Sequence, residues 1–339
     1  MTVLVLPGFS CRVQPQQVET PKPARGALDV EYSRNTGIVP GYEVFEITFS
    51  HDKVYANPFF DVTIDVVFTS PSKKEMHVGG FCYGSSSGPE IRIENQQRRQ
   101  VSYHFDKQDI WKARFAPSEP GRWDYVFVFR NEQGQEARGE GSFTCIVGRK
   151  PNPGFVRLHP ENQFRFVFDD GSPYFPIGLQ DCWGDNSGTG SVLDQCAMEG
   201  PFRIDLKEPP ELPPGPMFVR GPANNPQNAD VYLRYFSQCG FNLYRYSQQN
   251  CSFPLNSDLD KYLVQEAVMT DELLCSARKY GFRIFYGIFG FQKAFNQGPY
   301  DEVTMSKVKR FIQQDYKTVI KTKYTEIRKQ GGSKLQKGS

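Results

Sequence analysis

The sequence predicts a multidomain chain of class β then α/β, and three observations support this. Short runs of alternating apolar and polar residues fill the region before residue 150, whereas helical spacing appears only after residue 229. Between these regions, residues 164–183 read FRFVFDDGSPYFPIGLQDCW, which fits a hairpin followed by a strand buried on both faces. The predicted fold is an immunoglobulin-like β-sandwich followed by an incomplete TIM (β/α)8 barrel of about three β/α units.

The N-terminal region, residues 1–39, is rich in proline, glutamine and charge, and we expect a disordered leader or linker there. The start, MTVLVLPGFSC, resembles the end of a lipoprotein signal with Cys11 as the acylated residue. A secretory signal needs a basic region and a longer apolar stretch, and this start has neither. A disordered or wrongly started N-terminus is therefore the favoured interpretation.

Residues 40–148 are expected to form the sandwich. About seven or eight short strands separated by turn residues are typical of an immunoglobulin-like fold. Cys82 and Cys145 could pair within it in an oxidising compartment, while buried free thiols are at least as good an interpretation. The strongest alternation of apolar and polar residues lies in four runs: Phe45–Phe49, Val62–Phe68, Trp111–Phe115 and Trp123–Phe129.

Residues 149–163 contain proline and glycine and are expected to be a linker to the partial barrel at residues 164–313. Strand, helix, strand, helix, strand and helix follow one another in this segment, which favours parallel strands joined by right-handed crossovers. The three strands are expected at residues 174–179, 241–246 and 282–289.

Two further segments of the chain have a distinct composition. The insertion at residues 184–227 is rich in glycine, proline and asparagine, and its position after a strand favours a functional loop. Residues 314–339 are expected to form a basic helical tail, and a solvated end is a better interpretation of this charge than a nucleic-acid patch.

Composition and motifs exclude several classes of function. The formal net charge of +2 argues against a dedicated nucleic-acid binder. No run of about 18 apolar residues is present, so no membrane span is expected. The 8 cysteines lack the C-x-x-C spacing of a zinc or redox site, and all 4 histidines precede the barrel segment. No phosphate loop, nucleophile elbow or dinucleotide fingerprint is found, and we expect no cofactor and no metal.

The candidate substrate-binding residues follow the first two strands of the barrel segment. Arg245 would either hold a catalytic carboxylate or form a structural pair, for example with Asp181. Gln248 and Asn250 could bind sugar hydroxyls or be ordinary loop residues. Trp183 could stack on a sugar ring or simply pack, because high aromatic content also serves a core. A glycosidase needs two carboxyl groups, and no second suitable acid is found, so no catalytic residue is assigned.

The first domain resembles an immunoglobulin-like module of unknown function that precedes cellulase-like and agarase-like barrels in bacteria. The matching stretches are YANPFFDV, VGGFCYG and WKARFAPSEPGRWDYVF, of which the last is the most specific. The following DGSPYFPIGLQDCW and GFNLYRYSQQN resemble the first two strands of clan A (β/α)8 glycoside hydrolases. The resemblance covers residues 42–313.

The resemblance implies a function and its limits. In clan A an arginine at the end of strand two supports the nucleophile, and Arg245 matches it. The acid/base and nucleophile glutamates lie on strands four and seven, which this chain of three units does not reach. We therefore expect a truncated, inactive relative of enzymes that hydrolyse O-glycosyl bonds in polysaccharides. The alternative is a non-catalytic carbohydrate-binding or structural module.

The same resemblance implies a location and partners. The protein would be extracellular or periplasmic, and its partner would be a polysaccharide or oligosaccharide. An incomplete barrel would expose an open sheet edge, through which the chain could self-associate.

Overall fold

The structure is a computed structural model and describes part of the chain. The described residues are 21–95, 100–149, 152–180, 233–234, 236–247, 256–258, 261–262, 264–287, 301–303, 305–306 and 309. By their internal contacts they fall into two compact units. The sandwich unit contains the residues described within 17–88, 105–175 and 302–339, and the second unit contains those described within 89–104 and 176–301.

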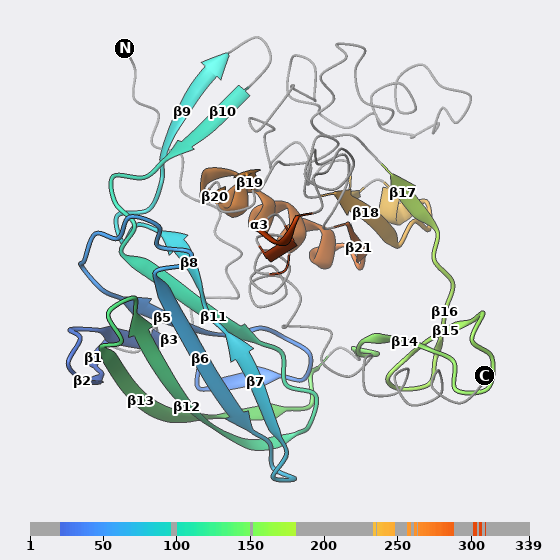
Figure 1. Ribbon diagram of the computed structural model, residues 1–339. Coiled ribbons are helices and arrows are strands. Elements are labelled where there is room, and N and C mark those ends of the chain that lie inside the picture. Colours follow the sequence, from blue (N-terminus) through green and yellow to red (C-terminus); the bar gives the residue numbers. More distant parts are fainter. Residues whose placement is uncertain are drawn as a thin grey trace. The chain divides into compact units, whose positions relative to one another are not determined.

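The sandwich unit is built from two mainly antiparallel sheets (Figure 1). The first sheet, which we call sheet A, has the order β1 (Lys22–Pro23), β3 (Glu31–Arg34), β5 (Phe45–Ser50), β11 (Ile110–Phe115) and β8 (Phe81–Gly84). The second, sheet B, has the order β2 (Arg25–Gly26), β13 (Glu136–Ile146), β12 (Gly121–Asn131), β6 (Val62–Thr69) and β7 (Glu75–Gly79). A further strand, β4 (Ile38–Pro40), pairs in parallel with β13.

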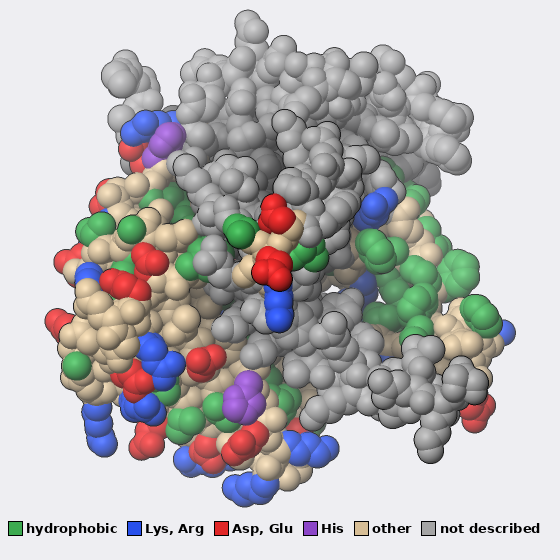
Figure 2. Space-filling view, viewed as in Figure 1, with side chains coloured by type: hydrophobic (Ala, Val, Ile, Leu, Met, Phe, Trp, Pro, Cys, Tyr) green, Lys and Arg blue, Asp and Glu red, His purple; other side chains and the backbone are tan. Residues whose placement is uncertain are grey.

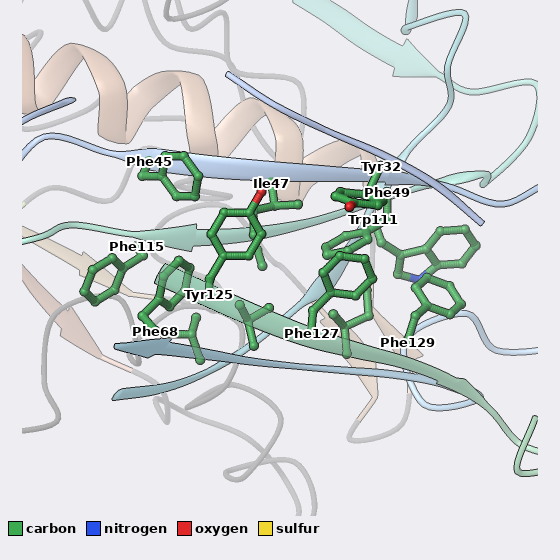
Figure 3. Close-up of a cluster of buried hydrophobic side chains, with 14 of the residues drawn as sticks. Tyr32, Phe45, Ile47, Phe49, Phe68, Trp111, Phe115, Tyr125, Phe127 and Phe129 are labelled. Carbon is green, nitrogen blue, oxygen red and sulfur yellow. The ribbon is translucent and has the colours of Figure 1, made fainter. Parts of the chain in front are cut away.

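The sandwich core consists largely of aromatic rings that alternate along the strands. Phe45 stacks on Phe143 with ring centroids 4.0 Å apart, and both rings belong to the buried core. Figure 3 shows Phe45 among other rings of this core. Two buried indoles also satisfy their polar atoms, because Trp111 Nε1 donates to Pro58 O at 3.3 Å and Trp123 Nε1 donates to Glu119 O at 2.8 Å. The two-layer sandwich is thus observed, whereas its immunoglobulin-like topology stays a prediction.

The sandwich begins earlier in the sequence than we expected. Strands β1, β2 and β3 and the start of β4 lie before residue 40, in the region interpreted as a leader. Val30 is only 1% exposed and Val39 only 2%, so these residues contribute to the core. The strands are short and irregular, and such segments lack the extended alternation by which strands are recognised in a sequence.

The predicted linker and the hairpin after it belong to the sandwich unit. A small antiparallel sheet there comprises β14 (Val156–Leu158), β15 (Phe166–Phe168) and β16 (Pro173–Tyr174). A hairpin was expected within residues 164–183, and β15 does pair antiparallel with β16. The linker range, in contrast, includes a strand.

Tyr42 connects the small sheet to the sandwich. Its φ of 63° is in the left-handed region, which residues other than glycine rarely adopt. Its ring meets that of Phe155 edge-on, with centroids 5.2 Å apart. Burial, and then the charge and hydrogen bond of Asp169, raise the pKa of Tyr42 to about 12. Asp169 also pairs with Arg157 and accepts a hydrogen bond from Phe155 N at 3.0 Å.

The second unit contains a three-stranded parallel sheet. Its order is β17 (Gly178–Gln180), β18 (Leu243–Ser247) and β21 (Arg283–Gly287), with α3 (Val264–Lys279) between the last two in sequence. Two antiparallel pairs accompany it: β9 (Glu90–Asn95) with β10 (Gln100–His104), and β19 (Asn256–Asp258) with β20 (Lys261–Tyr262). Among the described residues, no helix has the length and apolar character needed to cross a membrane.

The predicted partial TIM barrel is wrong for the part of the chain that the structure describes. That part is mostly strand and shows no series of helical barrel units. The parallel direction of the three strands is observed. The first of them was predicted at residues 174–179 but is β17 at Gly178–Gln180, whereas Tyr174 belongs to the antiparallel strand β16. Phe175 is 78% exposed and Ile177 is 42% exposed, although their apolar run was predicted to be buried on both faces. Figure 2 shows hydrophobic side chains gathered over the segment from β15 to β17.

Two cysteines of the sandwich that could have paired are free thiols. Cys82 on β8 and Cys145 on β13 are both buried. Burial raises the pKa of Cys82 to about 12 and the pKa of Cys145 to about 11. Of the two alternatives that the sequence left open, the structure therefore has the free thiols.

Gly139 provides a test of the core packing. It lies opposite Phe127 in the β12–β13 register, and a Cβ placed on it would lie 2.5 Å from the Phe127 ring. We expect Gly139→Ala to lower the free energy of unfolding by about 2 kcal/mol, because the ring has no free space into which to move. Urea unfolding followed by fluorescence measures this.

The control is Glu140→Ala, which changes the next residue on the exposed face of the same strand. It should alter stability by less than about 0.5 kcal/mol. Equal effects of the two substitutions would contradict this account of the core.

Candidate functional site

The first candidate site lies on one face of the parallel sheet. The register places Gln180, Arg245 and Phe285 side by side on adjacent strands. Because side chains alternate along a strand, Arg245 and Phe285 share a face, while Tyr244 points to the other. Tyr244 is fully buried, whereas Arg245 is exposed and Phe285 is 57% exposed. The face that carries Arg245 is therefore the accessible one.

Arg245 lies beside an aromatic ring. Its guanidinium carbon is 5.9 Å from the centroid of the Phe285 ring, within the range of a cation–π interaction. From the sequence, we expected Arg245 to be a charge in apolar surroundings that requires a buried counterion. Its side chain is exposed to water, so this requirement is weaker. A planar cation beside an exposed ring can donate hydrogen bonds to oxygen atoms while the ring contacts the C–H face of a ligand.

The other sequence-predicted site residues lie outside the described residues. These are Asp181, Trp183, Gln248 and Asn250. Their roles, including the alternative of an Asp181–Arg245 pair, stay predictions. Among the described residues, no group of three or more acids, histidines and cysteines has the geometry to hold a metal ion.

A second candidate lies on the outer face of sheet A, and the sequence analysis did not find it. We call it the cation–aromatic cluster, and it consists of Glu46, Phe81, Tyr83, Lys112 and Arg114. Each of these residues alternates with a core residue along its strand, so all five face away from the core. Cross-strand pairing brings them together, because Arg114 lies opposite Glu46 and Lys112 lies opposite Phe81.

The cluster is held by charge pairs and ring contacts. Glu46 accepts hydrogen bonds from Lys112 Nζ at 2.8 Å and from Arg114 Nε at 2.6 Å. Lys112 Nζ lies 3.8 Å from the centroid of the Tyr83 ring, and the guanidinium of Arg114 lies 5.3 Å from that of Phe81. The three charged side chains are each less than 20% exposed, at 16%, 16% and 19%.

Electrostatics keep Glu46 ionised. Burial alone would raise its pKa, but the positive charges of Arg114 and Lys112 and their hydrogen bonds outweigh burial and hold the pKa below its ordinary value. The signal was present in the sequence as polar residues alternating with Phe45, Ile47, Trp111 and Ala113. It could not be interpreted without the register that makes β5, β11 and β8 neighbours.

One known protein family matches this chain, over part of its length, in the region where the module of unknown function was expected. The family DUF5060, described as a domain of unknown function, matches residues 38–130. This range lies within the sandwich and the β9–β10 hairpin. The predicted resemblance to a module of unknown function is thus confirmed over these residues. No curated protein matches the sequence.

Two solved structures that align with this chain are described as glycoside hydrolases. A candidate glycoside hydrolase from Bacteroides vulgatus ATCC 8482 aligns with a TM-score of 0.50 and 17% identity, covering 82% of this chain and 47% of that one. A family 39 glycoside hydrolase from Bacteroides cellulosilyticus WH2 aligns with a TM-score of 0.23 and 9% identity, covering 86% and 41%. This chain spans about half the length of the first structure. At 17% identity the likeness concerns the fold alone.

Glu46→Gln tests the charge balance of the cluster. The substitution leaves Lys112 and Arg114 without their shared carboxylate, so we expect a loss of about 2 kcal/mol in the free energy of unfolding at pH 7. Because the folded pKa is depressed, this stabilisation is present above the ordinary value of 4.5 and is lost as the pH falls through the folded pKa. Urea titrations between pH 7 and pH 3 should therefore show the two proteins converging.

The matched control is Glu140→Gln on an exposed position of β13. It should follow the wild type across the titration. A constant difference between Glu46→Gln and the wild type at every pH would contradict the electrostatic explanation.

Proposed function

We propose that this chain is part of a glycoside hydrolase-like protein that acts on the O-glycosyl bonds of polysaccharides outside the cytoplasm. The DUF5060 match and the fold likeness to a candidate glycoside hydrolase support the proposal. The resemblance of the sequence to clan A hydrolases supports it further, and it gives Arg245 the role of a residue that supports the nucleophile. We assign to this chain the binding of the sugar, and we expect no cleavage from it alone.

The observation that carries the proposal is the exposed face of the parallel sheet. Gln180, Arg245 and Phe285 lie across three adjacent strands. The guanidinium of Arg245 and the ring of Phe285 together match the hydroxyls and the apolar ring faces of a sugar. Asp181, Trp183, Gln248 and Asn250 are proposed to complete this surface, because each follows β17 or β18 in the sequence.

The test is retention on polysaccharides by the full chain. Affinity electrophoresis in gels that contain plant or algal polysaccharides measures retardation for each polymer. We expect at least one polymer to retard the chain and Arg245→Ala to weaken that retardation at least fivefold, because the substitution removes the donor group beside Phe285. Arg122→Ala is the matched control, since Arg122 is an exposed arginine of β12 and belongs to neither candidate site.

Three results bear on this proposal. The absence of retardation by every polymer would contradict it, and so would equal effects of the two arginine substitutions. A release of sugar products that is lost on Arg245→Ala would contradict the expectation that the chain does not cleave.

The alternative is a non-catalytic carbohydrate-binding module in the sandwich, and the cation–aromatic cluster favours it. Tyr83 and Phe81 place two rings beside two cations on an outer sheet face. Rings on the face of a β-sandwich can stack on sugars, and lysine and arginine can bind hydroxyl or acidic groups. This alternative requires no residue of the second unit.

Self-association of the chain through an open sheet edge, which the resemblance implied, also stays a prediction.

Tyr83→Ala distinguishes the two proposals in the same electrophoresis experiment. If the sandwich binds the polysaccharide, Tyr83→Ala should abolish retardation while Arg245→Ala leaves it unchanged, because the stacking ring is lost. Tyr83→Phe keeps the ring and should retain most of the binding. If Tyr83→Ala behaves like the wild type, the sandwich alternative is wrong.

A further inference from the structure

The cation–aromatic cluster carries a surplus of positive charge. Along β5, β8 and β11, the residues that face away from the core include two cations, Lys112 and Arg114, and one acid, Glu46. Two positive charges and one negative charge leave a net charge of +1 on this part of sheet A. Glu46 pairs with both cations, but a single carboxylate can cancel the charge of only one of them.

The outward-facing acid of the next strand is too distant to cancel the surplus. Glu31 on β3 lies opposite Ser50, which is four residues along β5 from Glu46. A strand rises about 3.3 Å per residue, so Glu31 is displaced from Glu46 by about 13 Å along the strand direction. Charges at this distance are largely screened at physiological ionic strength, where the Debye length is about 8 Å. The surplus charge therefore belongs to the cluster.

The two cations are well placed to attract an anion. Their side chains are mostly removed from water, and attraction between charges is stronger there than in bulk water. Their shared bonds to Glu46 hold both side chains in place, so a ligand does not have to order them on binding. An anion is thus attracted more strongly here than by a lysine on an open surface.

The aromatic rings on β8 add a second requirement for the ligand. Tyr83 and Phe81 are partly exposed and lie beside the cations. Such rings can pack against the apolar face of a flat ligand. The ligand that fits the whole cluster therefore combines an apolar ring face with a negatively charged group. Sugars that carry a carboxylate or a sulfate have both.

We propose that the cation–aromatic cluster binds acidic sugars, with the sugar ring against Tyr83 and Phe81 and its carboxylate or sulfate beside Lys112 and Arg114. Lysine and arginine donate strong hydrogen bonds to the oxygen atoms of such groups. A neutral sugar would gain nothing from the surplus charge. The inference rests on the alternative given above, in which the sandwich binds carbohydrate, and it names the class of polysaccharide.

Isothermal titration calorimetry of the full chain with matched polymers tests the proposal. Polygalacturonate is compared with its carboxyl-reduced form, and carrageenan with its desulfated form, so each pair differs in the charged group. We expect the charged member of at least one pair to bind about tenfold more tightly than its neutral partner, because only the charged member is attracted by the surplus charge. The pair that shows this difference distinguishes a carboxylate from a sulfate.

Thr48→Glu removes the surplus charge without removing a cation or a ring. Thr48 lies opposite Lys112 on the outward side of β5, and a glutamate there brings the net charge of the cluster to zero. We expect the charged polymer to bind about fivefold more weakly and any binding of the neutral polymer to stay unchanged. Thr48→Gln has the same size without the charge and should bind like the wild type. Near-UV circular dichroism checks that both variants keep the packed core.

Lys112→Met removes one of the two donors and should also weaken binding of the charged polymer about fivefold. Its matched control is Lys74→Met, which removes the same charge from an exposed position before β7 in sheet B. This control should bind like the wild type. Equal losses in the two lysine variants would show an effect of overall charge and would overturn the assignment to the cluster.

The results separate this inference from the proposal on which it rests. Equal binding of charged and neutral polymers, or wild-type binding by folded Thr48→Glu, would overturn the preference for acidic sugars and leave carbohydrate binding by the sandwich intact. If no polymer binds, or if binding is lost in Arg245→Ala but not in Tyr83→Ala, both the inference and the sandwich alternative are wrong.

Discussion

Burial of aromatic rings between two sheets is the constraint on which the sandwich depends. Interiors are close-packed, so each ring requires a small partner or a second ring at a matching position. Phe45 and Phe143 meet as a stacked pair, whereas Phe127 lies opposite Gly139. The same alternation sends Glu46, Lys112 and Arg114 to the outer face of sheet A. The core and the cation–aromatic cluster are therefore two results of one pattern.

The sequence predicted what alternation and turn residues determine locally. The strands around Phe45, Val62, Trp111 and Trp123 were all found where expected, because each has several apolar residues at a spacing of two. Three later strands were also expected to be parallel, and they are. The strands β1–β4 were missed because they are 2 to 4 residues long, too short for a period to appear.

The failure of the barrel prediction has a different physical cause. The apolar run around Phe175 suits a strand buried on both faces, yet it also suits a surface with exposed rings, and composition cannot distinguish them. Sites formed by residues of different strands could not be recognised from the sequence either. The bonds of Glu46 with Lys112 and Arg114 join residues up to 68 positions apart, and only the strand register brings them together. Of the site residues predicted from the sequence, only Arg245 lies within the described residues.

The buried free cysteines of the sandwich, Cys82 and Cys145, can report the opening of this domain. Only the thiolate attacks an alkylating reagent, and a thiol with a pKa near 11 or 12 is almost entirely protonated at neutral pH. Cys239 is exposed, in contrast. Modification of Cys239 would therefore precede that of Cys82 and Cys145. The delay between the two modifications would report how often the two sheets separate, and no probe residue would have to be introduced into the chain.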